Sequence, residues 1–216
     1  MVGKRQAVDD VAAQVRDLIV SGEFRPGQFL RLEPLAQKMG TSVTPVREAM
    51  VLLRGEGFVD LQPNRGFVVL PLSPRDIEDI YRVHAFVSGE LAALAARRLT
   101  AEALDDLVAF QHELEQAFAD GLDTRVEELN HAFHRAINRA ADSPRLVWFL
   151  RSASRYAPRM FFARIEGWAG ASAHDHQAIL RALQEHDPES ARAAMTDHVH
   201  NAGRLLARHH DTRWKP

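Results

Sequence analysis

Histidine is the residue type through which this sequence could do chemistry. The chain has eleven histidines, and all of them lie between positions 84 and 210. Asn130 and His134 are four residues apart and so share one face of a helix, while His176 and His198 belong to two later segments. Imidazole nitrogens together with one oxygen donor bind divalent Zn, Ni or Mn. These four side chains therefore form a candidate metal site.

Spacing alone leaves an alternative open, because histidine is also tolerated on helix surfaces. His209 and His210, near the C-terminus, are expected to be such surface residues. Three further histidines lie one or two positions from a proposed ligand and should point elsewhere on their helices. They are His131, His174 and His200.

The elements that must position these donors are helices. From position 74 onward we find no alternating strand pattern, and caps or prolines separate apolar-periodic segments. The predicted helices are 74–98, 101–119, 124–141, 144–165, 171–186 and 188–209. An all-helical bundle follows, and the core of a bundle is a common place for a metal site.

A second candidate site lies in Gly40–Gly57, which reads GTSVTPVREAMVLLRGEG. Thr44 is the predicted helix cap, and Pro45 the first helical residue. One predicted face is apolar, with Val46, Ala49, Met50 and Leu53. The opposite face carries Ser42, Thr44, Arg47 and Arg54. Hydroxyls and guanidinium groups are suited to phosphate and guanine contacts, although an ordinary amphipathic surface helix has the same pattern.

The neighbouring segments favour a DNA-binding domain. Segment 5–21 is a predicted first helix, and 31–39 is a short helix that Gly40 would end. Segments 58–61 and 66–70 have the pattern of two strands, joined by turn residues that include Arg65. Two helices with a tight turn, followed by a hairpin with a basic tip, make a winged helix-turn-helix.

The run from Phe24 to Val69 closely resembles the DNA-binding domain of the GntR family of bacterial transcription regulators. The matching stretches are FRPGQFL, LAQKMGTSVTPVREAM and LRGEGFVDLQPNRGFVV. The resemblance implies DNA contacts from Ser42, Thr44 and Arg47 on the recognition helix and from Arg65 and Gly66 on the wing. The family usually has Arg after the Ser, where this chain has Val43, so one expected contact is missing.

The second part of the chain is similar to the FCD domain of one GntR subfamily, through LNHAFHRAI, HDHQAILRAL and ARAAMTDHV. That resemblance implies a divalent metal held by Asn130, His134, His176 and His198, with a small organic acid bound at or beside it. Many relatives have an Asp where this chain has Asn130, and an Arg where it has His84. His84 is therefore either an effector-binding residue or part of the core packing.

Length and charge set the overall organisation. For 216 residues with 46% apolar content we predict two domains, residues 1–72 and 73–216. The first has nine basic and eight acidic residues, so a monomer should bind DNA feebly and a homodimer on a two-fold symmetric operator is expected. No apolar run reaches the length of a membrane span, no signal peptide is evident, and cysteine is absent, which favours a cytoplasmic protein.

The sequence therefore predicts a mainly α protein, with an N-terminal winged helix-turn-helix and a C-terminal FCD-like bundle, that acts as a ligand-responsive transcription regulator. Zn²⁺ is the first choice of metal, with Ni²⁺ or Mn²⁺ as alternatives. Two other functions stay open. In a metal sensor the cation itself would be the signal, and in a histidine-metal hydrolase a bound water would be the nucleophile. No HExxH or nucleophile motif supports the hydrolase, and we expect no enzyme.

Overall fold

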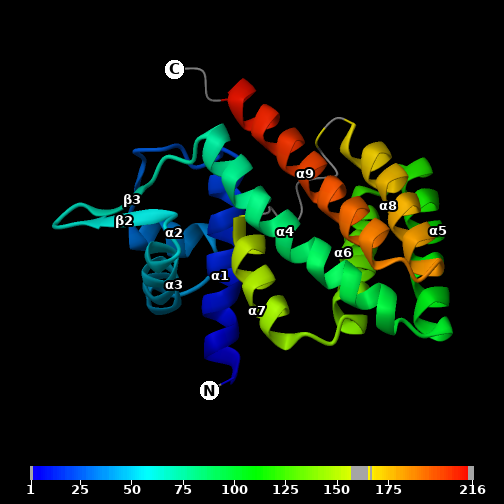
Figure 1. Cartoon of the computed structure of the whole chain (residues 1–216). Helices are drawn as coiled ribbons and strands as arrows, with labels where there is room; N and C mark the ends of the chain where they lie inside the picture. The colour runs from blue at the N-terminus through cyan, green and yellow to red at the C-terminus, as the bar shows by residue number, and fades with distance from the viewer. Residues whose placement is uncertain (1, 157–164, 166, 214–216) are drawn as a thin grey trace. The chain divides into compact units, whose positions relative to one another are not determined.

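The computed structural model describes residues 2–156, 165 and 167–213. The chain divides into two compact units, residues 2–73 together with 210–213 and residues 74–209, and each is described by itself. The predicted combination of a winged helix-turn-helix with an all-helical second part is confirmed (Figure 1).

The N-terminal unit consists of three helices and a three-stranded sheet. Its helices are α1 (Val2–Val20), α2 (Leu32–Lys38) and α3 (Val43–Gly55). Its strands are β1 (Phe29–Leu30), β2 (Val59–Gln62) and β3 (Gly66–Val69). All three strands are antiparallel in the order β1-β3-β2, and the β2–β3 hairpin extends away from the helices (Figure 1). The sequence pattern did not predict β1, because two residues are too few to show alternation.

The turn between α2 and α3 has the predicted helix stop. Gly40 has a positive φ of 63°, its N–H donates to the carbonyl of Gln37, and the N–H of Thr41 donates to that of Ala36. This pair of bonds is the Schellman motif, which favours glycine at the left-handed position.

The predicted start of α3 is wrong by two residues. Ser42 is the N-cap, Val43 is the first helical residue, and Thr44 lies inside the first turn. Pro45 is the third helical residue, a position whose N–H has no acceptor within the helix, so proline is tolerated there as well. The hydroxyl of Ser42 makes no capping hydrogen bond. The Ser42 side chain therefore takes no part in capping α3.

The core of the N-terminal unit lies between α1, α3 and the sheet. The apolar face predicted for α3 is buried, since Val46, Ala49, Met50 and Leu53 are each 0% exposed. Arg16 on α1 forms a two-point ion pair with Glu56, just after α3, with Nε 2.7 Å from Oε2. Because both side chains are largely buried, this pair fixes the end of α3 against α1.

The second unit, Pro74–His209, is all-helical in the part that the structure describes. Its elements are α4 (Pro74–Arg98), α5 (Ala101–Ala119), α6 (Asp123–Ala140), α7 (Pro144–Ala153), the 3₁₀ turn η1 (Ser154–Tyr156), α8 (Trp168–Gln184) and α9 (Pro188–Arg213). Helices α4 and α5 have the predicted bounds. Helix α4 packs on α6, α7 and α8, and α5 packs on α6 and α8.

Four predicted helices have ends that differ from the prediction. Helix α6 lies one residue earlier at each end than the predicted 124–141, α8 ends at Gln184 instead of 186, and α9 continues to Arg213 instead of ending at 209. The helix predicted over 144–165 ends as an α-helix at Ala153, where the Ser154 hydroxyl donates to the carbonyl of Leu150 and competes with the regular ladder. Residues 157–164 of that prediction lie outside the described residues. Helix α8 begins at Trp168, three residues before the predicted start, because only Gly167 has a positive φ (81°) and Gly170 is helical.

Helices α4 and α9 approach each other closely at two glycines. A Cβ on Gly203 would lie 2.5 Å from the Cβ of Tyr81, and a Cβ on Gly89 would collide with the Thr196 hydroxyl. Near Gly89, Arg192 on α9 pairs with Glu90 on α4 at 2.7 Å. These contacts fix α9, which carries His198, against α4.

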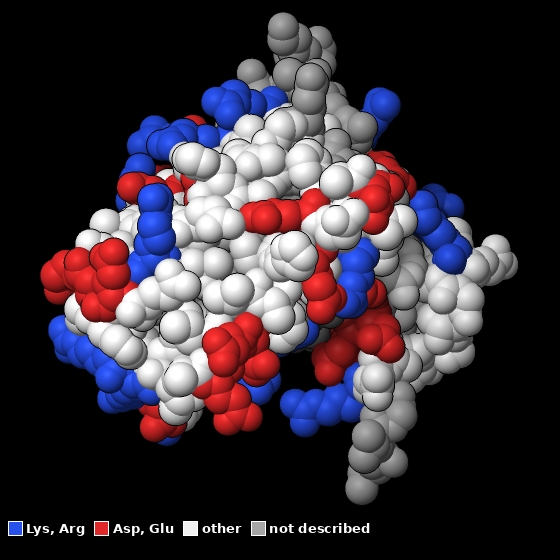
Figure 2. All heavy atoms as spheres, turned by 90° about the vertical axis from the view of Figure 1, so that its right-hand side faces the viewer, with Lys and Arg blue, Asp and Glu red and all other residues white. Residues whose placement is uncertain are grey.

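Charge is mixed on the surface of the molecule shown in Figure 2. Basic and acidic side chains are interspersed there around a broad uncharged area. A face of this kind lacks the continuous basic stripe typical of a nucleic-acid footprint. Within the described residues, none of the helices is both long and apolar enough to span a lipid bilayer.

Candidate metal centre and DNA-binding surface

Three helices bring their histidines together inside the C-terminal unit. His134 of α6, His176 of α8 and His198 of α9 each offer a ring nitrogen, and these nitrogens lie within 4.8 Å of one another. The Nε2 atoms of His134 and His198 are 3.1 Å apart. His176 is 0% and His198 5% exposed. The structure thus places the three predicted histidine ligands in one buried cluster.

Asn130, the predicted fourth donor, lies one helical turn before His134 on α6. Its side-chain oxygen Oδ1 is buried and has no hydrogen-bond partner among the described residues. A buried amide oxygen without a donor costs free energy and calls for a partner. A cation beside the histidines would supply one, so this observation fits the predicted donor set.

His176 is held by hydrogen bonding and by stacking. Its Nδ1 lies 2.9 Å from Oε1 of Gln111 on α5, and its ring stacks on that of Phe133 with 4.2 Å between centroids. Its other nitrogen, Nε2, is buried without a hydrogen-bond partner in the described part of the chain. One nitrogen is thus occupied by the protein, and the other is free for a ligand bond.

His198 has a carboxylate neighbour. Oδ2 of Asp175 lies 3.5 Å from His198 Nδ1 and accepts a 2.8 Å hydrogen bond from Nδ2 of Asn201. Burial would raise the pKa of Asp175, but the nearby His198 ring and the hydrogen bond from Asn201 outweigh it and lower that pKa below the usual value. Asp175 is therefore an anion that faces the back of the His198 ring, as in a carboxylate–histidine–metal triad.

Burial keeps two histidines of the cluster uncharged. It lowers the pKa values of His134 and His176 well below the usual value for histidine, and the neighbouring His198 adds to the effect. Metal ions bind the neutral imidazole. The free energy that normally opposes metal binding through histidine deprotonation is therefore small for His134 and His176 at neutral pH.

His84 of α4, the predicted effector residue, borders this cluster. Its Nε2 lies 3.5 Å from the Ser154 hydroxyl, its ring centroid is 5.5 Å from that of Tyr81, and its Nδ1 is buried without a partner in the described region. Burial, with a smaller contribution from His198, lowers its pKa to about 4. His84 is consequently neutral at pH 7 and can offer a carboxylate only a single hydrogen bond.

Sequence reasoning missed Gln111 and Asp175. Asp175 had a signal, because it directly precedes His176 in the HDHQ motif. Gln111 had none, because an isolated glutamine on a helix resembles a surface residue, and only the fold shows that it is 2% exposed.

The predicted DNA-binding residues of α3 are on the surface. Ser42, Thr44 and Arg47 are all exposed at the N-terminal end of the helix, the end that usually contacts base edges in this motif. Val51 lies one turn after Arg47 on the same side and is 60% exposed. It breaks the apolar pattern of α3 and could contact a thymine methyl group. Arg54, further along, is already paired with Asp60 at 3.0 Å.

At the wing tip, Arg65 and Gly66 follow a tight turn. Pro63 and Asn64 occupy its two central positions, Asn64 has a positive φ of 62°, and Arg65 N–H donates to the carbonyl of Gln62. This combination is typical of a type II turn. The Arg65 guanidinium lies 6.0 Å from the centre of the Phe29 ring. Gly66 has a structural role of its own, since its φ is 98° and a Cβ would lie 3.2 Å from the carbonyl oxygen of Leu30.

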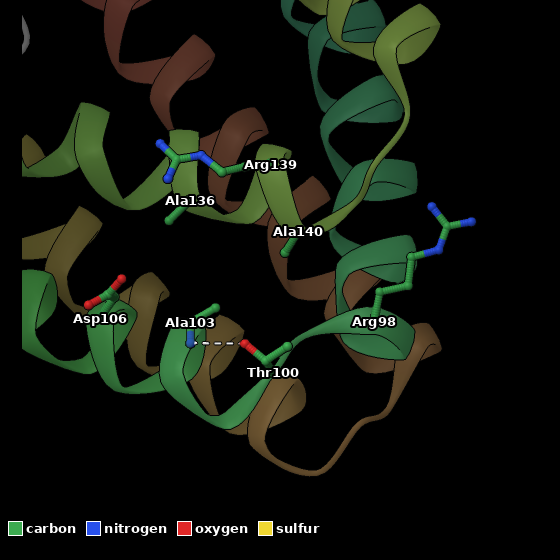
Figure 3. Close-up of a pocket in the computed structure, with 7 residues that line it drawn as sticks. All are labelled: Arg98, Thr100, Ala103, Asp106, Ala136, Arg139 and Ala140. Atoms are coloured by element: carbon green, nitrogen blue, oxygen red, sulfur yellow. Dashed lines mark hydrogen bonds between the residues drawn. The ribbon is translucent and has the colours of Figure 1, made fainter.

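A surface pocket of about 150 Å³ lies elsewhere in the helical unit (Figure 3). Its lining includes none of the predicted site residues. Thr100 caps α5 by accepting a bond from Ala103, and the Arg98 guanidinium points away from the other labelled residues. Arg98 donates instead to the carbonyl groups of Ala141 and Asp142 at the end of α6. These polar groups serve the helix ends, and we assign no ligand to the pocket.

Comparison with known families gives a match to each unit. Residues 7–69 match the family described as bacterial regulatory proteins, gntR family, and residues 79–201 match the FCD domain.

Proteins similar to this chain include transcription regulators. A probable D-xylose utilization operon transcriptional repressor of Paenarthrobacter nicotinovorans is 31% identical over 91% of this chain and 88% of its own length. The Exu regulon transcriptional regulator of Escherichia coli is 25% identical over 94% and 85%, respectively. The solved structure of E. coli McbR/YncC has a TM-score of 0.74 at 23% identity, covering 94% of this chain and 98% of that one, and it supports the fold.

Proposed function

Because the chain belongs to the GntR family of bacterial regulatory proteins and carries an FCD domain, we propose that it is a homodimeric regulator whose operator binding responds to a small anionic metabolite bound at a divalent metal. As a member of this family, the chain is a ligand-responsive GntR-type transcription regulator and not an enzyme. The metal, the class of effector and the dimer are our proposal.

The histidine cluster carries the proposal of a metal. Three ring nitrogens lie within 4.8 Å of one another and two of them are 3.1 Å apart, so small shifts of the side chains would bring all three onto one cation. The partnerless Oδ1 of Asn130 and Nε2 of His176 supply two buried lone pairs. Nitrogen-rich sets of this kind suit Zn²⁺ first, with Ni²⁺ and Mn²⁺ as alternatives.

The charge of the donor set supports an anionic effector. Asn130, His134, His176 and His198 are all neutral ligands, so a bound divalent cation would keep its full charge apart from the influence of Asp175. A small organic acid placed on an open coordination position would neutralise it. His84 can add one hydrogen bond to such a ligand.

Exposed apolar side chains on two adjoining helices support the dimer. Val83 and Phe86 of α4 are 59% and 66% exposed, and Trp148 and Phe149 of α7 are 60% and 56% exposed. With 150–250 Å² per aromatic side chain, this exposed area is roughly 400–500 Å² per chain. Doubled across a two-fold axis it approaches about 1,000 Å², near the lower limit of a specific interface.

DNA would be bound by the exposed N-terminal end of α3 and by the wing. Ser42, Thr44 and Arg47 would enter the major groove, while Arg65 and the backbone at Gly66 would contact a neighbouring groove or phosphate. A dimer places two such surfaces on DNA, and half-sites about 34 Å apart are sensitive to shifts of a few ångströms between the two copies. An effector needs only a different affinity for two arrangements of the dimer.

The test is a binding titration on labelled DNA that flanks the chain's own gene. The purified full chain is compared in three states: stripped with a chelator, reloaded with Zn²⁺, and reloaded in the presence of a panel of small carboxylic acids. Binding that responds to an acid only in the reloaded protein supports the proposal. A response to Zn²⁺ alone identifies a metal sensor, and no DNA complex even at low salt contradicts the assignment of α3.

A further inference from the structure

The ring nitrogen that binds a metal must lack a proton, and a neutral imidazole can carry its proton on either nitrogen. For each histidine of the cluster, the identity of the hydrogen-bond partner on the far side of the ring decides which nitrogen is free.

Gln111 has only one possible amide orientation. Its Nε2 lies 2.7 Å from Oε1 of Glu115 and 3.1 Å from the backbone carbonyl oxygen of Ala173. The same Glu115 oxygen accepts a 2.7 Å bond from Gln177. A carbonyl oxygen can only accept, so the NH₂ group of Gln111 must face it, and Oε1 must face His176.

That orientation determines the tautomer of His176. Oε1 of Gln111 is an acceptor only, and it lies 2.9 Å from His176 Nδ1, so Nδ1 must carry the proton. Nε2 then has a lone pair. This nitrogen is buried, and the His176 ring stacks on the ring of Phe133.

Asp175 likewise favours the Nδ1–H tautomer of His198. Its carboxylate oxygen, oriented by Asn201, faces His198 Nδ1. At 3.5 Å the two atoms are not hydrogen-bonded, but the negative charge of the carboxylate favours a proton on Nδ1, which leaves a lone pair on Nε2. The 3.1 Å contact between His198 Nε2 and His134 Nε2 is then a hydrogen bond in which His134 is the donor.

We propose that Gln111 and Asp175 are positioning residues that hold His176 and His198 in the Nδ1–H tautomer before a metal arrives, whereas His134 starts as the Nε2–H tautomer and must change. A cation held by Nε2 of His134 would require that nitrogen to give up its proton, and uptake of one proton at Nδ1 would keep the ring neutral. The proposal rests on the proposed metal site for its purpose, but its tautomer assignments hold for the metal-free protein.

The experiment is two-bond ¹H–¹⁵N correlation spectroscopy of the full chain labelled with ¹⁵N-histidine, which distinguishes the two tautomers. Spectra are recorded after chelation and again after one equivalent of Zn²⁺, with signals assigned through single histidine substitutions. We expect Nδ1–H signals for His176 and His198 in both states. His134 should show Nε2–H without metal and Nδ1–H with Zn²⁺.

Variants separate positioning from folding. Gln111→Leu removes the acceptor, so His176 should become a mixture of tautomers, and Zn²⁺ affinity measured by competition with a chromophoric chelator should fall about 10- to 100-fold. In Gln111→Glu the carboxyl group, protonated on the oxygen that faces Glu115, keeps an acceptor for Nδ1–H and should retain the His176 tautomer. Gln116→Leu, an exposed glutamine on the same helix, is the matched control and should change neither.

The outcomes are distinguishable. An Nε2–H signal for His176 in the chelated wild-type protein, or an unchanged tautomer in Gln111→Leu, would overturn the positioning roles. The expected tautomers combined with no Zn²⁺ binding would overturn the proposed metal site and leave the hydrogen-bond assignments standing. Expected tautomers with a loss of affinity only in Gln111→Leu would support both.

Discussion

The Nε2 atoms of His134 and His198 lie 3.1 Å apart, although 64 positions separate the two residues in the sequence. Two nitrogens at the usual 2.0–2.1 Å from a tetrahedral Zn²⁺ are about 3.3 Å from each other. The two rings would therefore have to separate by only a few tenths of an ångström to bind one ion. Helices α6 and α9 thus hold this pair close to the geometry that a metal requires.

Adding Zn²⁺ to the chelated protein is expected to raise its midpoint of thermal unfolding. A ligand at about 100 times its Kd stabilises the folded state by about 2.7 kcal/mol. For a chain of this size that corresponds to a rise of roughly 5–10 °C. Differential scanning calorimetry measures the shift, and metal analysis should find about one ion per chain.

His134→Ala should abolish that Zn²⁺-dependent shift. His174→Ala is the matched control, because His174 is exposed and lies two positions from the ligand His176. Loss of the shift in both variants, or in neither, would contradict the assignment of the cluster.

Arg47→Ala is expected to weaken operator binding by about 1–3 kcal/mol per half-site, or roughly 5- to 150-fold. The exposed guanidinium on α3 is the group best placed to contact a base edge or a phosphate. Fluorescence anisotropy on labelled operator DNA measures the loss. Arg97→Ala, which removes the same charge from an exposed position on α4, should leave affinity within about twofold. Equal losses in the two variants would mean that overall charge matters and not the α3 surface.

How much the sequence could reveal depended on the range of the interactions involved. The apolar spacing of Val46, Met50 and Leu53 predicted a buried face because helical periodicity is a local property. The stop at Gly40 is likewise local. The meeting of His134, His176 and His198 was predicted through the family resemblance, since spacing along the chain does not determine which helices pack together.

Other features depend on contacts that no local pattern encodes. Strand β1 exists because Phe29 and Leu30 pair with Val68 and Phe67, about 40 residues later. The burial of Gln111 depends on the packing of α5 against α8. The register of the α3 start was misjudged because both Ser42 and Thr44 are good capping residues, and only the backbone shows which one is outside the helix.

Phe86→Glu is expected to weaken self-association at least about 10-fold, because burial of a phenylalanine contributes roughly 1.5–3 kcal/mol and the new charge would have to be desolvated. Analytical ultracentrifugation across micromolar concentrations measures the monomer–dimer equilibrium. Phe118→Glu is the control, since Phe118 is 49% exposed on α5 and lies outside the proposed surface. A dimer that withstands Phe86→Glu but dissociates in Phe118→Glu would move the interface to α5.

Gly203→Ala should destabilise the helical unit by about 1–3 kcal/mol, the usual cost of forcing extra volume into a packed site. The new Cβ would lie 2.5 Å from the Cβ of Tyr81, an atom that cannot move without its helix. Gly170→Ala is the control, because that glycine is helical and has open space around its Cβ direction. It should be neutral or stabilising by up to about 1 kcal/mol. Urea unfolding separates the two, and equal free energies of unfolding would show that α4 and α9 are not in tight contact there.

Acidification is expected to destabilise the metal-free protein at pH values below about 6.5. The folded pKa of His84 is lowered to about 4, and those of His134 and His176 are also lowered by burial. In the unfolded chain each would titrate near 6.5. Above that pH the three histidines are neutral in both states and contribute no pH dependence. As the pH falls below 6.5, the unfolded chain binds protons that the folded chain does not, and the free energy of unfolding decreases.

The expected loss is roughly 1 kcal/mol for each of the three groups at pH 5.5. Urea unfolding of chelated protein at pH 7.5, 6.5 and 5.5 measures it. The carboxylates Asp175 and Asp187 do not interfere, because their folded pKa values are lowered from an ordinary value of 3.8 and they stay ionised in this range. His84→Asn should reduce the pH dependence by about one third, since it removes one of three groups. A free energy of unfolding that is the same at pH 7.5 and 5.5 would show that these imidazoles are not shielded from water, and the buried neutral cluster would have to be abandoned.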